Sequence, residues 1–291
     1  MEKETGSYRV SDINLAAGYG AKQIIQRIGT SSLQDKLILR KDSILRKEWY
    51  EKNLLNHLEF FVWEENVADT VEMLEELFSL EEEEREQEEI EEVRVLLCKK
   101  QETRWEEGDE NPRIRLKVAK WPFQIIFELE IIPYLGKSDS LEERILKEEV
   151  SESEEVIYYM FTLEEYLARS FYKIIDHLEL IKSLSWYQDI YDIITNEVVE
   201  GRKVSQSFEQ LILDHPIPAL EDRLAIIQDY ETYEYMNKRW KRQNKRWKTS
   251  CPQWGEITRL LVRFFKPMIE EIQKDEVFVG DWMPQLARYL D

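Results

Sequence analysis

The sequence predicts an α+β fold, with a mixed sheet and flanking helices in residues 1–150 and an all-helical half in residues 151–291. Segments with the apolar runs or strict alternation of strands are confined to the first half, whereas apolar residues at helical spacing dominate the second. A content of 43% hydrophobic and 12% aromatic residues indicates a folded chain. Its 291 residues suit one large domain or two moderate ones.

Composition limits the function and the cellular location. The formal net charge of −20 repels nucleic acid at long range, so a polyanionic partner would need a local basic patch. Cys98 and Cys251 are far apart and fit two ordinary reduced thiols better than a disulfide framework or a thiolate zinc site. Without a run of transmembrane length or a signal-peptide pattern, we expect a cytoplasmic protein with no membrane contact.

The first half contains alternating helices and strands. We expect helices over 11–28, 43–55 and 67–80, and strands over 37–39, 58–63, 93–99, 113–119 and 123–132. In the last strand, alternation places Glu128 and Glu130 side by side on one face. The acidic run 81–92 is expected to be a solvated helix end or loop, or alternatively a counter-surface for a basic partner.

The second half follows a charged segment, 137–155, which is expected to be a linker. Helices are expected over 162–184, from Ser185 onward, and over 205–213, 218–247 and 254–273. In the second of these, Asp189 and Asp192 stand three residues apart on one helix face. The tail after residue 273, with Phe278 and Trp282, is expected to pack back on the body.

Four segments in order support a family resemblance: LILRKDSIL (37–45), LNHLEFFV (55–62), FTLEEYLARSFYKII (161–175) and YQDIYDI (187–193). They resemble motifs of the AbiEii-type nucleotidyltransferases, whose members include abortive-infection and toxin–antitoxin toxins. The resemblance implies a nucleotidyltransferase-like mixed sheet and a role in phage defence. It also implies Mg²⁺ and a nucleoside triphosphate as cofactors, and RNA as the molecule that is modified.

The resemblance also implies roles for individual residues. Lys41, Asp42 and Ser43 match the turn that binds phosphates, and Lys173 lies beside the position of a helical lysine, here Ser170. The catalytic candidates are Glu59, Glu128, Glu130, Asp189 and Asp192, and the metal candidates are His57, Glu59 and Glu128. Either Glu128 or Glu130 would be the third carboxylate.

Two of these motifs depart from the family pattern. Lys41 and Asp42 replace glycines, so side chains crowd the approach of a triphosphate, and Asp42 carries a charge of the same sign. His57-x-Glu59 replaces Asp-x-Asp, although Mg²⁺ requires hard carboxylate oxygens. We therefore expect a pseudoenzyme that acts through binding or assembly, with an antitoxin or complex subunit as its protein partner. The alternative is an active Mg²⁺-dependent nucleotidyltransferase that modifies RNA.

A basic segment, 238–248, is the other outstanding feature. It mixes cations with aromatic residues, which is typical of surfaces that bind single-stranded nucleic acid. The RNA-binding candidates are Lys241, Arg242, Lys245, Arg246 and Trp247. The favoured alternative is a helix whose tryptophans face the core, while its cations lie in solvent or meet the glutamates of 81–92.

Overall fold

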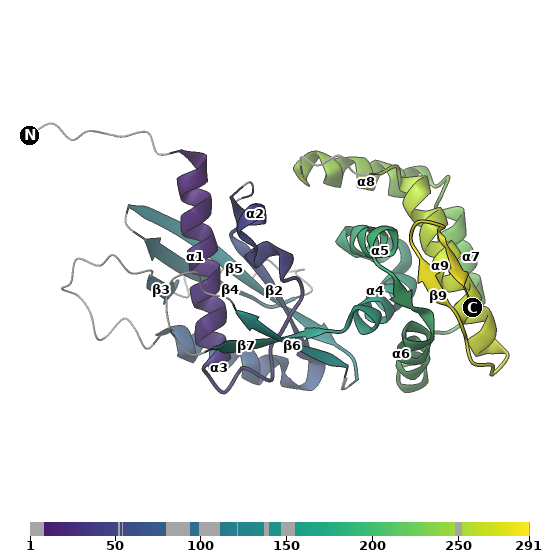
Figure 1. The fold of residues 1–291 in the computed structure, drawn as a ribbon, viewed down its shortest axis with the longest axis horizontal. Helices are drawn as coiled ribbons and strands as arrows, with labels where there is room; N and C mark the ends of the chain where they lie inside the picture. The colour runs from purple at the N-terminus through teal and green to yellow at the C-terminus, as the bar shows by residue number, and fades with distance from the viewer. Residues whose placement is uncertain are drawn as a thin grey trace, which may run out of the picture. The chain divides into compact units, whose positions relative to one another are not determined.

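The protein consists of two compact units, which divide between Phe161 and Thr162. The computed structural model shown in Figure 1 describes residues 9–51, 53, 55–79, 94–98, 111–120, 122–136, 140–146, 155–247 and 252–290. The acidic run 81–92 and Cys251 lie outside these residues. The two units are described separately below.

The N-terminal unit is built on a seven-stranded mixed sheet with the strand order β3-β4-β5-β2-β1-β7-β6. The strand β2 is parallel to β5, β1 is parallel to β7, and the remaining neighbours are antiparallel. This mixed sheet, flanked by helices and followed by a helical half, confirms the predicted fold class. The strands are β1 (Ile38–Leu39), β2 (His57–Trp63), β3 (Arg94–Leu97), β4 (Arg113–Lys120), β5 (Phe123–Tyr134), β6 (Leu141–Leu146) and β7 (Val156–Phe161).

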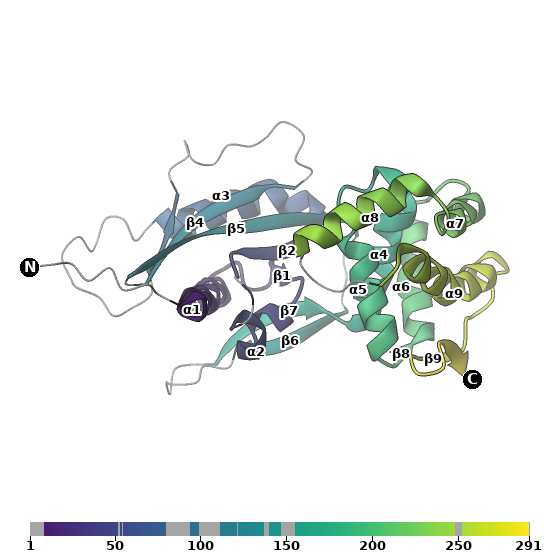
Figure 2. The same cartoon turned by 90° about the horizontal axis from the view of Figure 1, so that it is seen from above.

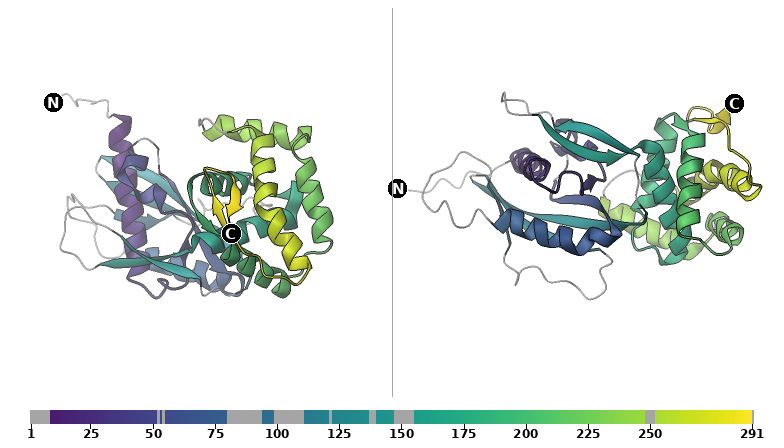
Figure 3. Two further views of the ribbon diagram at one scale, coloured as in Figure 1. Left: turned by 45° about the vertical axis from the view of Figure 1, so that its right-hand side comes forward. Right: turned by 90° about the horizontal axis from the view of Figure 1, so that it is seen from below.

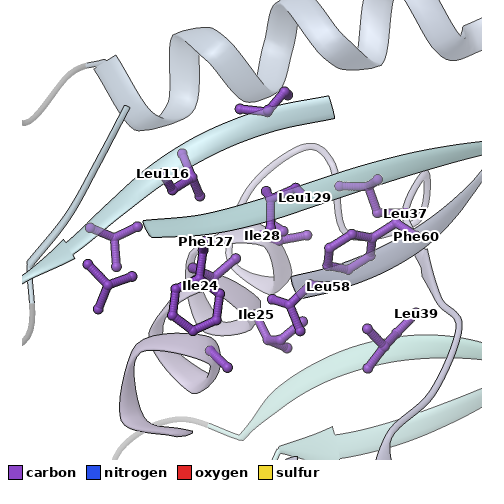
Figure 4. Packing of buried hydrophobic residues seen from close by; sticks show 14 of the residues in the cluster. Ile24, Ile25, Ile28, Leu37, Leu39, Leu58, Phe60, Leu116, Phe127 and Leu129 are labelled. Carbon is purple, nitrogen blue, oxygen red and sulfur yellow. The ribbon is translucent and has the colours of Figure 1, made fainter. Parts of the chain in front are cut away.

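The core of this unit lies between one face of the sheet and two helices, α1 (Val10–Gly29) and α3 (Val67–Ser79). Alternation along β2 and β5 directs side chains such as Leu58 and Phe127 into this core. Figure 4 shows Ile24 and Ile25 of α1 among these strand residues, and Figure 2 shows α1 and α3 beside the strands. One face of the central strands is therefore apolar and covered.

Three sequence predictions for this unit were wrong. The segment 43–55 is not one helix: a 3₁₀ turn η1 (Ser43–Leu45) and a short α2 (Lys47–Tyr50) are separated by Arg46, whose extended backbone interrupts helical hydrogen bonding. The segment 137–155, predicted as a linker, contains β6. The residues of β7, predicted to lie in an all-helical half, pair with β1 and β6 in the sheet. A further 3₁₀ turn, η2 (Glu64–Asn66), follows β2.

The C-terminal unit is mainly helical (Figure 3). In it α4 packs on α5 and α6, while α9 packs on α5, α6, α7 and α8. The helical half that the sequence predicts is present, and a small three-stranded sheet of order β10-β9-β8 accompanies its helices. The elements are α4 (Leu163–His177), η3 (Leu178–Leu180), α5 (Ser185–Asn196), β8 (Val199–Glu200), α6 (Gly201–Asp214), α7 (Leu220–Asp229), α8 (Glu234–Trp247), α9 (Trp254–Gln273), β9 (Asp281–Met283) and β10 (Arg288–Leu290).

Two predicted helices end earlier than expected. The first stops at His177 because Leu178 has a left-handed backbone with φ of 50°. The segment 218–247 forms two helices, α7 and α8. Trp254 Nε1 donates to the carbonyl oxygen of Tyr230 at 2.8 Å, and that oxygen would accept from Glu234 N–H in a continuous helix.

The C-terminal tail packs on the helices, as predicted. Phe278 and Trp282 are buried, and Trp282 Nε1 donates to the carbonyl oxygen of Ile194 at 2.7 Å. Tyr289 donates its hydroxyl proton to the carbonyl oxygen of Phe264. Among the helices of the described ranges, none is long and apolar enough to cross a membrane.

Candidate functional site

The face of the N-terminal sheet opposite the apolar core carries a group of charged side chains. Strand register brings them together: His57 pairs with Glu128 and Glu59 with Glu130 across the parallel β2 and β5. On the other side of β5, Arg115 of β4 pairs with Glu128 and Arg113 with Glu130. Because paired residues point to the same face, acids and bases from three strands meet there. We call these residues, together with Arg40, the polar sheet face.

Each of the three carboxylates of this face has an arginine partner. Arg40 Nη1 lies 2.5 Å from Glu59 Oε1, and Arg115 Nε donates to Glu128 Oε1 at 3.0 Å. Glu130 Oε2 lies 3.3 Å from Arg113 Nη2. The positive and negative side chains therefore balance before His57 is counted.

Glu130 is the most enclosed of the three acids, with 14% of its side chain exposed. Its Oε2 lies 3.3 Å from His57 Nε2, and its Oε1 accepts from Asn111 Nδ2 at 2.6 Å. Burial raises the pKa of Glu130, but the hydrogen bonds from His57 and Asn111 and the charge of Arg113 outweigh it and lower the pKa from 4.5 to about 2. Glu130 is therefore an anion at neutral pH.

His57 responds to the same contacts in the opposite sense. Burial lowers its pKa, but the hydrogen bond to Glu130 and the charges of Glu59 and Glu130 more than offset this, so that the pKa lies above 6.5. A second approach, 4.0 Å from His57 Nδ1 to Glu128 Oε2, adds another anion near the ring. The imidazole is thus held among carboxylates and favours its cationic form.

One set of metal-ligand atoms does converge on this face. Single ligand atoms of His57, Glu59 and Glu130 lie within 4.8 Å of one another, whereas Glu128, the predicted ligand, is not in this group. The donor chemistry does not fit Mg²⁺, which takes carboxylate oxygens and water. Here the two carboxylates are already bonded to Arg40 and to Arg113, and the third group is an imidazole. The face as it stands is an ion-pair network.

The predicted phosphate turn lies just after β1. Ser43 begins η1, and Asp42 forms an ion pair with Arg46 at 3.6 Å. Burial and the charge of Asp42 raise the pKa of Tyr158, on β7, to about 12. Lys41 and Asp42 are both half-buried. The turn therefore places an anionic side chain, bonded to a neighbouring arginine, where the resemblance implies bound phosphates.

The site candidates of the C-terminal unit lie on α4 and α5. Asp189 is buried and accepts a hydrogen bond from the hydroxyl of Tyr166 at 2.5 Å, whereas Asp192 is exposed and accepts from Gln188. The ammonium group of Lys173 lies 5.3 Å from the centre of the Trp186 ring. Asp189 thus braces α4 against α5, and the two aspartates do not share one surface.

The predicted RNA-binding segment forms α8. Met236 and Trp240 are buried, and Trp240 Nε1 donates to the carbonyl oxygen of Pro252 at 3.0 Å. Lys241, Arg242 and Lys245 lie exposed on the opposite side of the helix. The side chains of Arg246 and Trp247 lie outside the part of the protein that the structure describes. The alternative of a core-facing tryptophan is thus confirmed for Trp240, and the cations are left at the surface.

Comparison with known proteins adds only a distant structural likeness. Neither a model of a protein family nor a curated protein matches the chain. Among solved structures, it is similar to JHP933 from Helicobacter pylori, with a TM-score of 0.45 and 9% identity over 92% of this chain and 96% of that one.

Sequence reasoning missed the cationic half of the polar sheet face. Arg40 directly follows an apolar strand, and this position in the sequence indicates only that a turn begins there. In β4, Arg113 and Arg115 alternate with the buried Ile114 and Leu116, so they lie on the outer face of the strand. Their acidic partners became visible only with the register between β4 and β5, which alternation within one strand does not determine.

Proposed function

We propose that this protein keeps a nucleotidyltransferase-like sheet, related to that of AbiEii-type toxins, but does not perform Mg²⁺-dependent nucleotidyl transfer. It works in the cytoplasm as a binding or assembly subunit, with an antitoxin or another complex component as its partner. The pairing of Glu59, Glu128 and Glu130 with arginines is the observation that supports this proposal. A role in phage defence follows from the same resemblance.

Electrostatics explains why the ion pairs oppose metal binding. Three carboxylates and three guanidinium groups sum to zero charge, and protonation of His57 makes the sum positive. One guanidinium about 5 Å from a divalent cation repels it by about 2 kcal/mol in water and by about 7 kcal/mol at an effective dielectric constant of 20. Two-metal transfer requires the opposite arrangement, with anionic oxygens that are free to coordinate the ions.

Incorporation of radiolabelled nucleotides into a tRNA pool, with Mg²⁺ or Mn²⁺ present, tests this proposal. We expect the same background with the wild-type protein as with Glu59→Ala. Robust incorporation that Glu59→Ala abolishes would show an active transferase and overturn the proposal.

The alternative function, Mg²⁺-dependent nucleotidyl transfer to RNA, would use the convergence of His57, Glu59 and Glu130. In that case binding of substrate would have to draw Arg40 and Arg113 away from the carboxylates. The Ser43 hydroxyl and the turn around Lys41 and Asp42 would then contact the nucleotide phosphates. The transfer assay above decides between the two functions.

The exposed side of α8 supports a nucleic-acid-binding role within the proposed function. Among the described residues, Lys238 forms an ion pair with Glu234 at 2.9 Å, and no ion pair to a described carboxylate is found for Lys241, Arg242 or Lys245. Tyr233 and Tyr235, at the start of the helix, are 43% and 47% exposed, with ring centres 5.9 Å apart. Cations and exposed rings along one helix suit the phosphates and bases of single-stranded RNA.

Binding of single-stranded RNA, measured by fluorescence anisotropy over a range of salt concentrations, tests this role. Lys241→Gln, Arg242→Gln and Lys245→Gln together are expected to weaken binding and to reduce its salt dependence, because each removes one phosphate contact.

The matched control variant carries Arg202→Gln, Lys203→Gln and Lys266→Gln, three exposed positions away from α8. It changes the net charge by the same three units and is expected to bind RNA like the wild type. Equal binding by both triple variants would remove the RNA role and leave the basic surface for an acidic protein partner.

A further inference from the structure

We infer that Arg40 is an internal cation that closes a latent divalent-metal site on the polar sheet face, and that its removal opens that site. The inference rests on the proposed function, because it concerns the same residues. The inference goes beyond the proposed function because it assigns the block on metal binding to one side chain. It also predicts a metal site in a variant of this chain.

Backbone geometry fixes the position of Arg40. The residue follows β1 directly, and its N–H donates to the carbonyl oxygen of Glu59 at 2.9 Å, which extends the pairing of β1 with β2 by one position. Ile38 pairs with Phe61, so Arg40, two residues on, lies beside Glu59 on the same face. The side chain is therefore directed at the carboxylate by the strand itself.

Burial distinguishes Arg40 from the other two arginines. Its side chain is 2% exposed, whereas those of Arg113 and Arg115 are each 40% exposed. An exposed guanidinium can move into water when a ligand displaces it. A buried one must keep an anionic partner, because an unpaired charge inside a protein is strongly destabilising. A metal ion competing for Glu59 would therefore meet a positive charge that cannot withdraw into water.

Removal of the Arg40 charge would leave a usable set of ligands. Glu59, Glu130 and, once the metal displaces its proton, His57 offer two carboxylate oxygens and one imidazole nitrogen within 4.8 Å of one another. Glu59 is 26% exposed, so an ion can reach it from solvent. Mixed oxygen and imidazole ligands suit Mn²⁺ or Zn²⁺ better than Mg²⁺. Mn²⁺ is therefore the appropriate probe.

Electron paramagnetic resonance of free Mn²⁺, titrated with the full-length protein, measures this site. Arg40→Met keeps the length and apolar stem of the side chain without its charge, and Arg40→Gln keeps a hydrogen-bond donor for Glu59. Both are expected to bind Mn²⁺ at least about tenfold more tightly than the wild type, the change that loss of one nearby positive charge produces even at the dielectric constant of water. Adding Glu59→Gln to Arg40→Met should abolish the gain.

Arg144→Met is the matched control. It removes an arginine of the same unit that forms an ion pair with Glu142 on β6 and is 48% exposed. Its Mn²⁺ binding is expected to equal that of the wild type. An equal gain in Arg144→Met would mean that net charge, rather than Arg40, controls metal binding, and would overturn the inference.

The remaining outcomes separate this inference from the proposed function. If Arg40→Met and Arg40→Gln fold but bind Mn²⁺ no better than the wild type, and the wild type transfers no nucleotide, the inference fails while the proposed function stands. If the wild type binds Mn²⁺ as tightly as the variants and also transfers nucleotides, both fail. If neither variant folds alone, Mn²⁺ is expected to restore folding by occupying the cluster, and failure to do so overturns the inference.

Discussion

The contacts of Glu130 predict a measurable contribution to stability. Its pKa falls from 4.5 to about 2 on folding. At about 1.4 kcal/mol for each tenfold change in the protonation equilibrium, this corresponds to about 3 kcal/mol. The contribution is fully present above pH 4.5, because the depressed pKa favours the anion in the folded state, and it is lost as the pH falls toward 2. Glu130→Gln should therefore lower the free energy of unfolding at pH 7 by about 2–3 kcal/mol.

Amide hydrogen exchange of β4 and β5 measures this effect within the N-terminal unit, whose opening need not coincide with that of the other unit. The difference between wild type and Glu130→Gln should shrink steadily below pH 4.5. Glu142→Gln, which removes an exposed ion-pair carboxylate on β6, is the matched control and should change stability by less than about 1 kcal/mol. If Glu130→Gln protects these amides as well as the wild type at pH 7, the ion-pair account of this face is wrong.

Three further predictions test the sheet, the histidine and a helix start. Phe127→Ala should lower the free energy of unfolding in urea by about 3–5 kcal/mol because the ring is fully buried. Ile126 is 45% exposed on the other face of β5, so Ile126→Ala should lower it by under about 1 kcal/mol. Nuclear magnetic resonance titration of His57 should give a pKa above 6.5 that falls in Glu130→Gln. The contribution of the His57 cation to stability is therefore present below pH 6.5 and lost as the pH rises through the folded-state pKa. A His57 pKa that the variant leaves unchanged would contradict this. Thr162→Ala should destabilise the C-terminal unit by about 1 kcal/mol in thermal unfolding, because the Thr162 hydroxyl accepts a hydrogen bond from Glu165 N–H at 3.3 Å at the start of α4. An unchanged midpoint would show that this cap contributes nothing.

Local periodicity was sufficient for much of the fold. Alternation in β5 placed Glu128 and Glu130 on the face opposite Phe127, and the structure confirms this. The apolar spacing after Trp254 predicted α9 with the bounds it has, from Trp254 to Gln273. These elements were predictable because their side chains report directly which face is buried.

Elements that depend on distant partners were not predictable. The segment LEERIL looked like a charged linker, and it is a strand because β7 pairs with it along its whole length. The continuous helical pattern of 218–247 gave no sign that this segment would form two helices. Trp254 Nε1 donates to the carbonyl oxygen of Tyr230 at the break between them. The bond between Arg40 and Glu59 joins two strands that the sequence could not align.

Thermal unfolding of the wild-type protein with nucleoside triphosphates tests the central claim, that the polar sheet face does not bind nucleotide through a metal ion. Each triphosphate is compared with Mg²⁺ and with a chelator, since a ligand that binds only the folded state raises the midpoint. The account predicts that the midpoint with each nucleotide is the same in both conditions. A Mg²⁺-dependent increase that disappears in Glu59→Gln would contradict it.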